Sequence, residues 1–428
     1  MNRVQETGLI KFIIDELKPK GKIITPFNVI STITVLAAIV ILFYRFKNGL
    51  GAVTHASQDH PWGLWINFNV ITGVAFAGGA YVVTFMVYIL GLEKYKPIVR
   101  ATVLYALLAY MFYAGALLLD LGRPWKVVNP IIGNSFGISS VLFLVAWHFI
   151  LYMISLFIEF SPTIAEWSFL KNQRRALASM TLAVVIFGIA LSTLHQSGLG
   201  ALFLMAKAKI HPLWYSEFIP ILFFISSIFA GLSLVIVLET IGQKAFGKTM
   251  SFLHKSSHRP ILISLARVCT VSMFVYFFMT LLVFIHGKNY PYLNTGWGLW
   301  YLVEVIGFVF IPCVMFLAGY RSSNIGLIRT AAVMTIIGII LNRLNISTIA
   351  YHWYDNTLHF PTWMEIVVSF AVIFVQIHVF RWIVRRMPVY TESPSWIHEE
   401  TGIKSFTLKD KLFTLNNTRR EKWKVSQK

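Results

Sequence analysis

The chain has 428 residues, of which 57% are hydrophobic and 13% are charged, and its mean hydropathy is +0.67. These values exclude a set of water-soluble domains and indicate a protein whose core lies in a lipid bilayer. The net charge of +19 does not require a nucleic-acid partner, because lysine and arginine in a membrane protein report orientation. Cys269 and Cys313 are too few thiols for a zinc finger or an iron–sulfur cluster.

Ten apolar runs, each long enough to cross the hydrocarbon core, follow one another along the chain. The predicted spans are 25–44, 64–90, 98–120, 137–160, 177–195, 217–239, 261–285, 298–319, 326–350 and 363–384. We therefore expect an all-α membrane protein with three parts: an amino-terminal segment (1–24), a ten-helix transmembrane domain (25–384) and a basic tail (385–428).

Most of the 37 lysine and arginine residues flank the ends of the spans that would lie on the same side as the amino terminus. The positive-inside rule then predicts that both termini are cytoplasmic and that the protein lies in the cytoplasmic (inner) membrane. Because residues 1–22 are charged, we expect no cleavable secretory signal. The tail could be a solvated extension near anionic lipid or a docking site for a cytosolic partner.

Two similar segments open the second and eighth spans, PWGLW at 61–65 and GWGLW at 296–300. Each places two tryptophans and a later polar residue at offsets of zero, three and seven, which share one face of an α-helix. These trios are Trp62, Trp65 and Asn69, and Trp297, Trp300 and Glu304. The tryptophans alone are also typical of the aromatic belt at a membrane interface.

Ionisable side chains within spans are costly unless they are paired or wetted, so their positions are informative. Asp120, His195 and Arg343 lie near the predicted extracytoplasmic ends of their spans. Glu304 lies near the same end of its own span. We expect these residues to form one polar layer close to the extracytoplasmic face. Two structural explanations remain open: an ion pair of Glu304 with Arg343 that joins helices, and a local ion pair of Asp120 with Arg123.

A polar layer of this kind suits a lipid-soluble quinone, which needs hydrogen-bond donors and two protons at its ring and an apolar gap for its tail. A membrane haem would instead need two histidines at matched depth on facing helices. The mid-span residues His148 and His378 do not match in predicted depth, so they are better interpreted as buried or wetted histidines.

Several motifs together resemble the NrfD/PsrC family of integral quinone-interacting subunits, and are most similar to its HybB-type ten-helix branch. They are PWGLWINF, FAGGAY, LLLDLGRPW, LHQSGLGAL, KIHPLWYSE, YLVEV and HFPTWMEI, in this order. The resemblance covers roughly residues 45–388.

This resemblance implies two four-helix bundles, helices 2–5 and 6–9, flanked by peripheral helices 1 and 10. It implies a menaquinone site near the extracytoplasmic face, with no haem or iron–sulfur cluster in the chain itself. The implied partners are an extracytoplasmic iron–sulfur, ferredoxin-like subunit and the hydrogenase, molybdopterin or multihaem cytochrome subunits of the same complex. The chain would be the quinone-binding part of an oxidoreductase complex, without activity of its own.

The motif matches and the predicted layer together suggest two sets of site residues and no metal ligands. The expected catalytic residues are His195, Asp120, Glu304 and Arg343, and the expected quinone-binding residues are Trp62, Trp65, Asn69, Arg123 and Gln196. Related chains can carry an acidic residue where this one has Asn69, which puts a proton role there in doubt. The competing functions are a secondary transporter or ion channel that uses the buried charges, and a structural membrane anchor.

Overall fold

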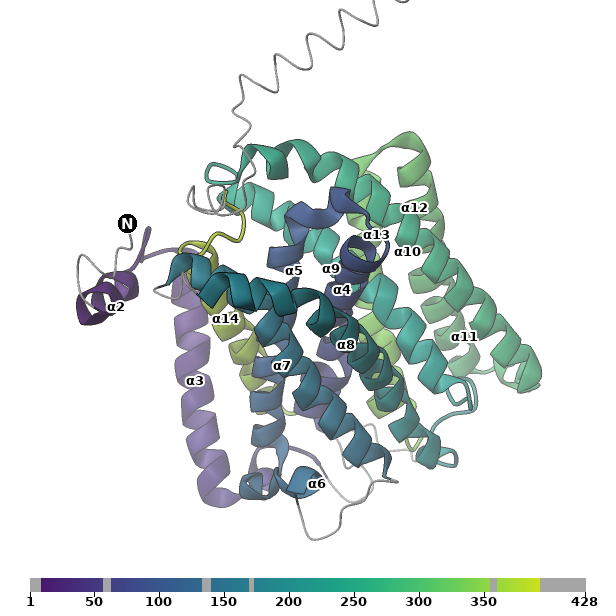
Figure 1. Ribbon diagram of the computed structural model, residues 1–428. Coiled ribbons are helices and arrows are strands. Elements are labelled where there is room, and N and C mark those ends of the chain that lie inside the picture. Colours follow the sequence, from purple (N-terminus) through teal and green to yellow (C-terminus); the bar gives the residue numbers. More distant parts are fainter. Residues whose placement is uncertain (1–8, 57–62, 133–139, 169–172, 355–359, 393–428) are drawn as a thin grey trace, which may run out of the picture. The chain divides into compact units, whose positions relative to one another are not determined.

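The structure is a computed structural model, and it describes residues 9–56, 63–132, 140–168, 173–354 and 360–392 (Figure 1). Contacts divide the chain into two units, Met1–Tyr390 and Thr391–Lys428. Trp62 and nearly all of the predicted basic tail lie outside the described residues.

Within the described residues, ten helices are long and apolar enough to cross a membrane, as predicted. They are α3 (Pro26–Asn48), Trp65–Ile89 around α4 (Gly73–Thr84), Glu93–Asp120 with α5 (Lys96–Asp120), α7 (Val141–Trp167), Arg174–Ala206 with α8 (Arg174–Ala201), α9 (Ile219–Phe246), α10 (Phe252–His286), Gly296–Ser322 with α11 (Gly296–Leu302) and α12 (Ile311–Ser322), Ile325–Ile349 with α13 (Ile325–Leu344), and α14 (Trp363–Val384). The short helices α2 (Leu9–Leu17) and α6 (Asn129–Ile132) lie outside these spans.

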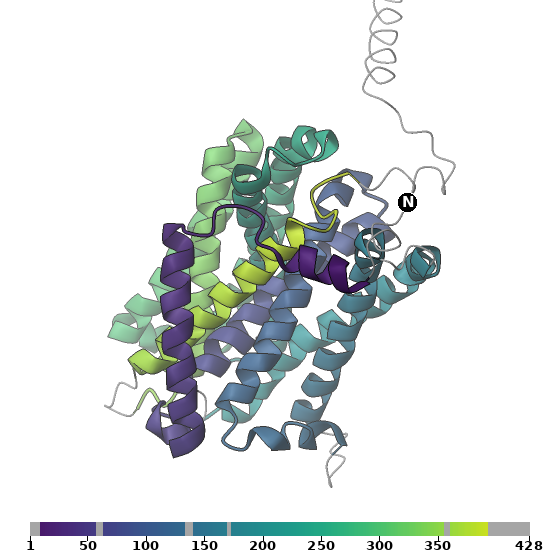
Figure 2. The ribbon, with the colours of Figure 1, turned by 90° about the vertical axis from the view of Figure 1, so that its left-hand side faces the viewer.

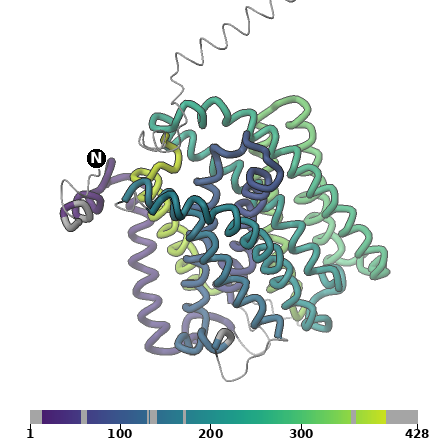
Figure 3. The backbone as a smooth tube through the Cα atoms, viewed as in Figure 1, coloured from purple at the N-terminus to yellow at the C-terminus, as the bar shows by residue number. Residues whose placement is uncertain are grey.

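The spans run back and forth, so their ends define two faces of the unit (Figure 3). We call the face at which α3 begins the amino-terminal face, and the other the opposite face. Helices α4, α5, α7 and α8 pack as one bundle, called the first bundle below, and α9, α10, α12 and α13 pack as another, the second bundle. Helices α3 and α14 lie side by side at the edge, next to α5, as expected for peripheral helices (Figure 2).

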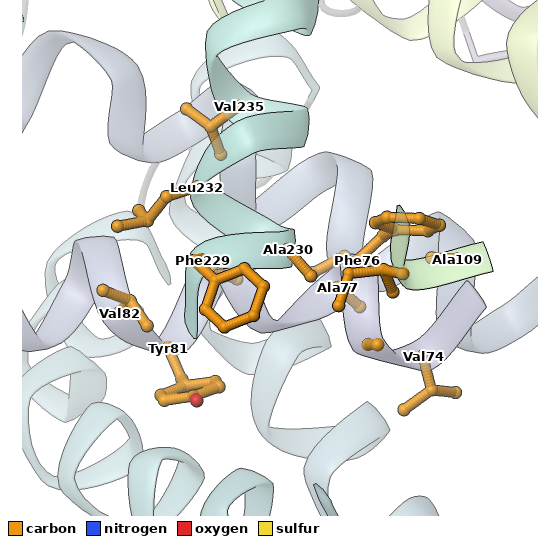
Figure 4. Packing of buried hydrophobic residues seen from close by; sticks show 14 of the residues in the cluster. Val74, Phe76, Ala77, Tyr81, Val82, Ala109, Phe229, Ala230, Leu232 and Val235 are labelled. Carbon is orange, nitrogen blue, oxygen red and sulfur yellow. The ribbon is translucent and has the colours of Figure 1, made fainter. Parts of the chain in front are cut away.

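The two bundles meet where α4 and α9 cross with their backbones in contact. A Cβ atom on Gly231 would lie 1.9 Å from the backbone nitrogen of Gly79, so only glycine fits at this position. A Cβ on Gly78 would meet the carbonyl oxygen of Ser227 at 2.6 Å. Apolar side chains of the same helices surround this contact, including Tyr81 and Phe229 (Figure 4). The small residues of FAGGAY therefore serve close helix packing.

Within the residues that the structure describes, four stretches of the spans are wound as π-helix: η2 (Trp65–Thr72), η3 (Phe85–Ile89), η9 (Val303–Phe310) and η10 (Asn345–Ile349). The shared face predicted for each tryptophan trio depends on α-helical spacing. The i→i+5 winding of η2 changes the angle about the helix axis between the Trp65 and Asn69 side chains. In η9, the same winding places Glu304 within a wider turn. Such turns occur frequently at functional sites.

The chain beyond α14 continues to pack against the first unit as far as Tyr390. Met387, Val389 and Tyr390 are buried, and the Tyr390 carbonyl accepts a hydrogen bond from the Ser251 backbone at 2.9 Å. The packed unit therefore extends past residue 384, the predicted end of the transmembrane domain.

A substitution at the contact of α4 with α9 should separate the bundles. In Gly231→Ala, the added methyl group would overlap the Gly79 backbone, and overpacking of this kind costs about 1–3 kcal/mol or more. We expect a melting temperature in detergent several degrees below that of the wild type. Gly115→Ala in α5 is the matched control, because no atom lies within 4 Å of the position that its methyl group would take. An equal loss of melting temperature in both variants would contradict the conclusion that the two bundles depend on close packing at Gly231.

Candidate functional site

Glu304, on η9, lies in the second bundle and accepts hydrogen bonds from three side chains. Trp214 Nε1 donates to Oε2 at 2.8 Å, Asn342 Nδ2 donates to Oε1 at 2.7 Å, and Asn345 Nδ2 also donates to Oε2. Glu304 is only 3% exposed. Three donors directed at two oxygens suit a carboxylate, so these partners offset the cost of burying its charge.

Arg343, on α13, is linked to Glu304 through an amide rather than by a direct ion pair. Its Nη1 donates to Asn342 Oδ1 at 2.7 Å, and Asn342 donates in turn to Glu304. Its Nη2 donates to Ser226 Oγ at 2.6 Å, and its guanidinium lies 3.6 Å from the centre of the Phe223 ring. No ion pair of Glu304 with Arg343 is found among the described residues, so the structural alternative of a direct pair is not observed and a bridged network joins the two side chains.

Beside this network lies a cavity of about 40 Å³, lined in part by Tyr276, Tyr301 and Arg343. A water molecule needs at least roughly 10–15 Å³ of such volume, so the cavity suits a few waters. The contacts of Glu304 and Arg343 thus favour a hydrated structural network in the second bundle.

A ring of aromatic side chains covers this network at the opposite face. His211, in the connection between α8 and α9, is 1% exposed. The centre of its ring lies 5.6 Å from that of Trp214, 5.0 Å from Tyr292, 5.3 Å from Trp297 and 4.7 Å from Trp353. This cluster gathers residues of KIHPLWYSE and GWGLW, two segments far apart in the sequence. Trp297 is partly buried and packs against His211.

A second cluster lies between α5, α14 and the start of η2. A Cβ on Gly63 would lie 2.9 Å from Glu365 Oε1 and 3.3 Å from Asp120 Oδ1, so two buried carboxyl groups flank this glycine. Glu365 accepts from the backbone of Leu64 at 2.8 Å and of Thr362 at 2.9 Å. Asp120 Oδ1 has no hydrogen-bond partner among the described residues.

The basic residue at this turn of α5 is Arg45, from the end of α3. Its Nε donates to the Leu119 carbonyl at 3.0 Å, and its Nη2 donates to the Leu121 carbonyl. Arg123 is exposed, and no ion pair joins it to Asp120 in the part of the chain that the structure describes. The Asp120 turn is therefore capped from α3 and not by the Arg123 side chain.

His195, on α8, lies within the first bundle and is fully buried. Its ring is packed between Tyr110 and Phe149, at centre-to-centre distances of 5.7 and 5.5 Å. Its Nδ1 lies 3.2 Å from the Val145 carbonyl, which can only accept, so Nδ1 carries the proton. The neutral ring then offers Nε2 as an acceptor, and this atom has no partner among the described residues.

The remaining predicted residues also lie in or beside the first bundle. Gln196 Nε2 donates to the Val74 carbonyl at 2.8 Å, and Trp65 Nε1 donates to the Glu365 carbonyl at 3.0 Å. Asn69 is 1% exposed, and neither atom of its amide has a partner within the described ranges. Trp65 and Gln196 therefore direct side-chain N–H groups to backbone carbonyls of the chain itself. The Asn69 amide, in contrast, can still donate to and accept from a ligand.

The predicted polar residues belong to more than one hydrogen-bonded cluster, on the several helices from which the layer was predicted. Asp120, His195 and Asn69 belong to the first bundle and its edge, whereas Glu304 and Arg343 belong to the second. The sequence did not reveal the polar partners of these groups, namely Glu365, Trp214, Asn342, Asn345, Ser226 and Arg45. Glu365 and Trp214 stood within the motifs HFPTWMEI and KIHPLWYSE, but their contacts cross about 300 and 90 positions of sequence.

Burial among aromatic rings lowers the pKa of His211 to about 4, whereas an unfolded histidine titrates near about 6.5. The unfolded chain therefore binds more protons between these values, and stability falls as pH drops from about 6.5 to about 4. In His211→Gln this part of the pH dependence should disappear. Melting temperatures measured across this pH range test the prediction, with the exposed His286→Gln as control. Parallel profiles for wild type and His211→Gln would contradict it.

Removal of one donor from Glu304 should destabilise the second bundle. Trp214→Phe keeps an aromatic ring but leaves Oε2 of a buried carboxylate short of a partner, at a cost of about 1–3 kcal/mol. The free energy of unfolding in detergent, or the melting temperature, measures this loss. Trp125→Phe is the control because Trp125 is 73% exposed. A Trp214 variant as stable as this control would show that the indole bond contributes nothing.

Proteins with similar sequences are known. The family model described as "Polysulphide reductase, NrfD" matches residues 52–352. A protein of Nitratidesulfovibrio vulgaris (strain Hildenborough) is 39% identical over 376 residues, covering 87% of this chain and 97% of its own. The probable Ni/Fe-hydrogenase 2 b-type cytochrome subunit of Escherichia coli K12 is 25% identical, with 86% and 93% covered. The menaquinone reductase integral membrane subunit of N. vulgaris is 26% identical, with 82% and 88% covered. The chain therefore belongs to the NrfD family and is a multi-pass membrane protein.

Proposed function

We propose that this protein is the quinone-exchanging membrane subunit of a respiratory oxidoreductase complex, with its menaquinone site at the opposite face of the first bundle. The observation that carries the proposal is a set of buried polar atoms without partners among the described residues: both amide atoms of Asn69, Asp120 Oδ1 and His195 Nε2. Each such atom costs about 1–3 kcal/mol unless a ligand or water satisfies it. A quinone ring brings two carbonyl oxygens that need donors.

The relatives support the same class of function. One is named as a menaquinone reductase membrane subunit and another as a hydrogenase subunit. By its predicted orientation, the opposite face is extracytoplasmic, which would put the site within reach of a ferredoxin-like iron–sulfur partner. Hydrogenase, molybdopterin or multihaem cytochrome subunits would complete the complex in the cytoplasmic membrane.

The two protons of the quinone reaction can be assigned to particular side-chain atoms. Quinone reduction consumes two electrons, which the partner supplies, and two protons. Because Nδ1 of His195 donates to the Val145 carbonyl, the neutral ring accepts a proton at Nε2 from a quinol hydroxyl and, once protonated, can return it to a quinone oxygen. The carboxyl group of Asp120 supplies the second proton carrier, and Asn69 can donate to a quinone carbonyl through its amide.

The two mid-span histidines considered as haem ligands, His148 and His378, lie on different helices, α7 of the first bundle and the peripheral α14. Two axial imidazoles at matched depth on facing helices are needed. His195 is enclosed by Tyr110 and Phe149, whereas His378 pairs with Ser31 at 2.7 Å on the peripheral helices. We therefore include no haem of the chain's own in the proposal.

The transporter alternative would be favoured by unwound segments around Gly73 or Gly188. Gly188 lies inside the continuous helix α8, and Gly73 lies where η2 continues directly into α4. The helical winding at both glycines thus favours the quinone proposal over a transporter.

Substitution of the proposed proton carriers should abolish most quinone chemistry. In His195→Ala and in Asp120→Asn, we expect at least a tenfold loss of quinone-dependent electron transfer by the purified complex, because general acid–base groups typically contribute about 10²–10⁴-fold. His286→Ala, at an exposed helix end on the same face, is the control.

Two further measurements make this test specific. Co-purification of the partner subunits shows that assembly is intact, and binding of a quinone analogue to the variants separates loss of binding from loss of proton transfer. Unchanged turnover in both variants would remove these residues from the mechanism. A wild-type subunit that binds no quinone analogue would instead favour a structural anchor.

A further inference from the structure

A large apolar cavity opens among α3, η2, α4, α5, α9 and α14, and it extends from the amino-terminal face past the middle of the unit to Phe68 and Tyr113. Its volume is about 690 Å³, within the roughly 300–1,000 Å³ typical of ligand sites. Aromatic and aliphatic side chains dominate its lining, including Phe76, Leu234 and Ile373. None of the polar residues assigned above to quinone chemistry is among the lining residues of this cavity.

The cavity is elongated along the helix axes. Its lining runs along α9 from Leu234 to Phe246 and along α14 from Ile373 to just past its end at Arg385. The part along α9 alone spans twelve residues, a rise of about 18 Å, which is more than half of a hydrocarbon core about 30 Å thick. An acyl chain that enters at the amino-terminal face would therefore fit along its axis.

A second, basic pocket adjoins the mouth of this cavity and shares Arg381 and Arg385 with it. Its volume is about 240 Å³, and Lys20, Lys22 and Arg386 also line it. It lies between α14 and the segment that connects α2 to α3. Five cationic side chains thus surround a pocket at the end of an apolar cavity.

The positive charge of this pocket is only partly balanced. Glu16 pairs with Arg386 at 3.1 Å and with Lys20 at 2.8 Å. Arg381 bonds to the neutral Asn28 amide at 3.2 Å, and Arg385 donates to a backbone carbonyl. Among the described residues, no carboxylate forms an ion pair with Arg381 or Arg385, so two guanidinium groups remain available to an anion.

We propose that these two pockets form one binding site for an anionic glycerophospholipid of the leaflet at the amino-terminal face. Arg381 and Arg385 bind its phosphate, and an acyl chain occupies the apolar cavity. Basic pockets between membrane helices bind anionic headgroups in this way. The guanidinium fork suits phosphate oxygens, and the adjoining apolar lining explains why the ligand is a lipid and not a free phosphate.

The first experiment counts the lipids retained by the purified complex in mild detergent, by native mass spectrometry. For the double variant Arg381→Gln with Arg385→Gln, we expect at least a fivefold reduction in bound anionic phospholipid and no change in bound phosphatidylethanolamine. The matched control is Lys248→Gln with Arg321→Gln, two exposed basic residues at the same face and outside both pockets. Equal retention in the two double variants would overturn the proposal.

A second variant tests the cavity while keeping both arginines. Leu234→Trp fills part of the apolar volume, and we expect the same fivefold loss of anionic phospholipid. Release of menaquinone from this variant, with phospholipid unchanged, would show that the cavity holds a quinone and would overturn the lipid assignment.

A third measurement needs no variant. After removal of lipid from the wild-type complex, phosphatidylglycerol should raise its melting temperature, because a ligand bound only by the folded state stabilises it. Phosphatidylcholine at equal concentration should not. Equal shifts with both lipids would overturn the specific site and indicate a general detergent-replacement effect. Quinone turnover of the arginine variants is read separately, so this proposal and the quinone proposal can fail independently.

Discussion

The contact between Gly231 and the Gly78–Gly79 backbone is the constraint on which the arrangement of the two bundles depends. In hydrocarbon, helices gain little from burying apolar surface, so their association relies on close packing and on polar bonds between helices. A glycine-to-glycine crossing permits both. It brings the α4 and α9 backbones close enough for Tyr81 of α4 to bond with Ser227 of α9 at 3.0 Å. Helix α9 thereby becomes the element that joins the two bundles.

Helix α9 also separates structural polar groups from groups that remain available for chemistry. On its second-bundle side, Ser226 and Phe223 hold Arg343, and the network continues to Glu304 with almost every polar atom bonded. On its first-bundle side, His195 and Asn69 present atoms that have no partner among the described residues. A satisfied buried network stabilises a unique packing, whereas unpartnered buried atoms are a cost that ligand binding can offset.

The sequence was sufficient to predict the ten spans, because the hydrocarbon thickness imposes a length and an apolar composition on each helix. The small residues of FAGGAY likewise indicate close packing, since such residues on one helix face let a neighbouring backbone approach. The π winding of η2 and η9 could not be predicted, because it depends on tertiary packing and changes which residues share a face. Nor could the sequence separate Glu304 from His195, because a depth estimate along each helix says nothing about lateral position in the membrane.

Helix α14 shows how far lateral position matters. It lies at the edge of the unit, as predicted for a peripheral helix, yet its two ends meet two different kinds of chemistry. At the opposite face, Glu365 caps the helix, flanks Gly63 together with Asp120 and binds the start of η2. At the amino-terminal face, Arg381 and Arg385 border the apolar cavity. A lipid bound at this end would contact α3, α4, α9 and α14 together, so one helix would contribute to the proposed quinone site and to the proposed lipid site at opposite faces.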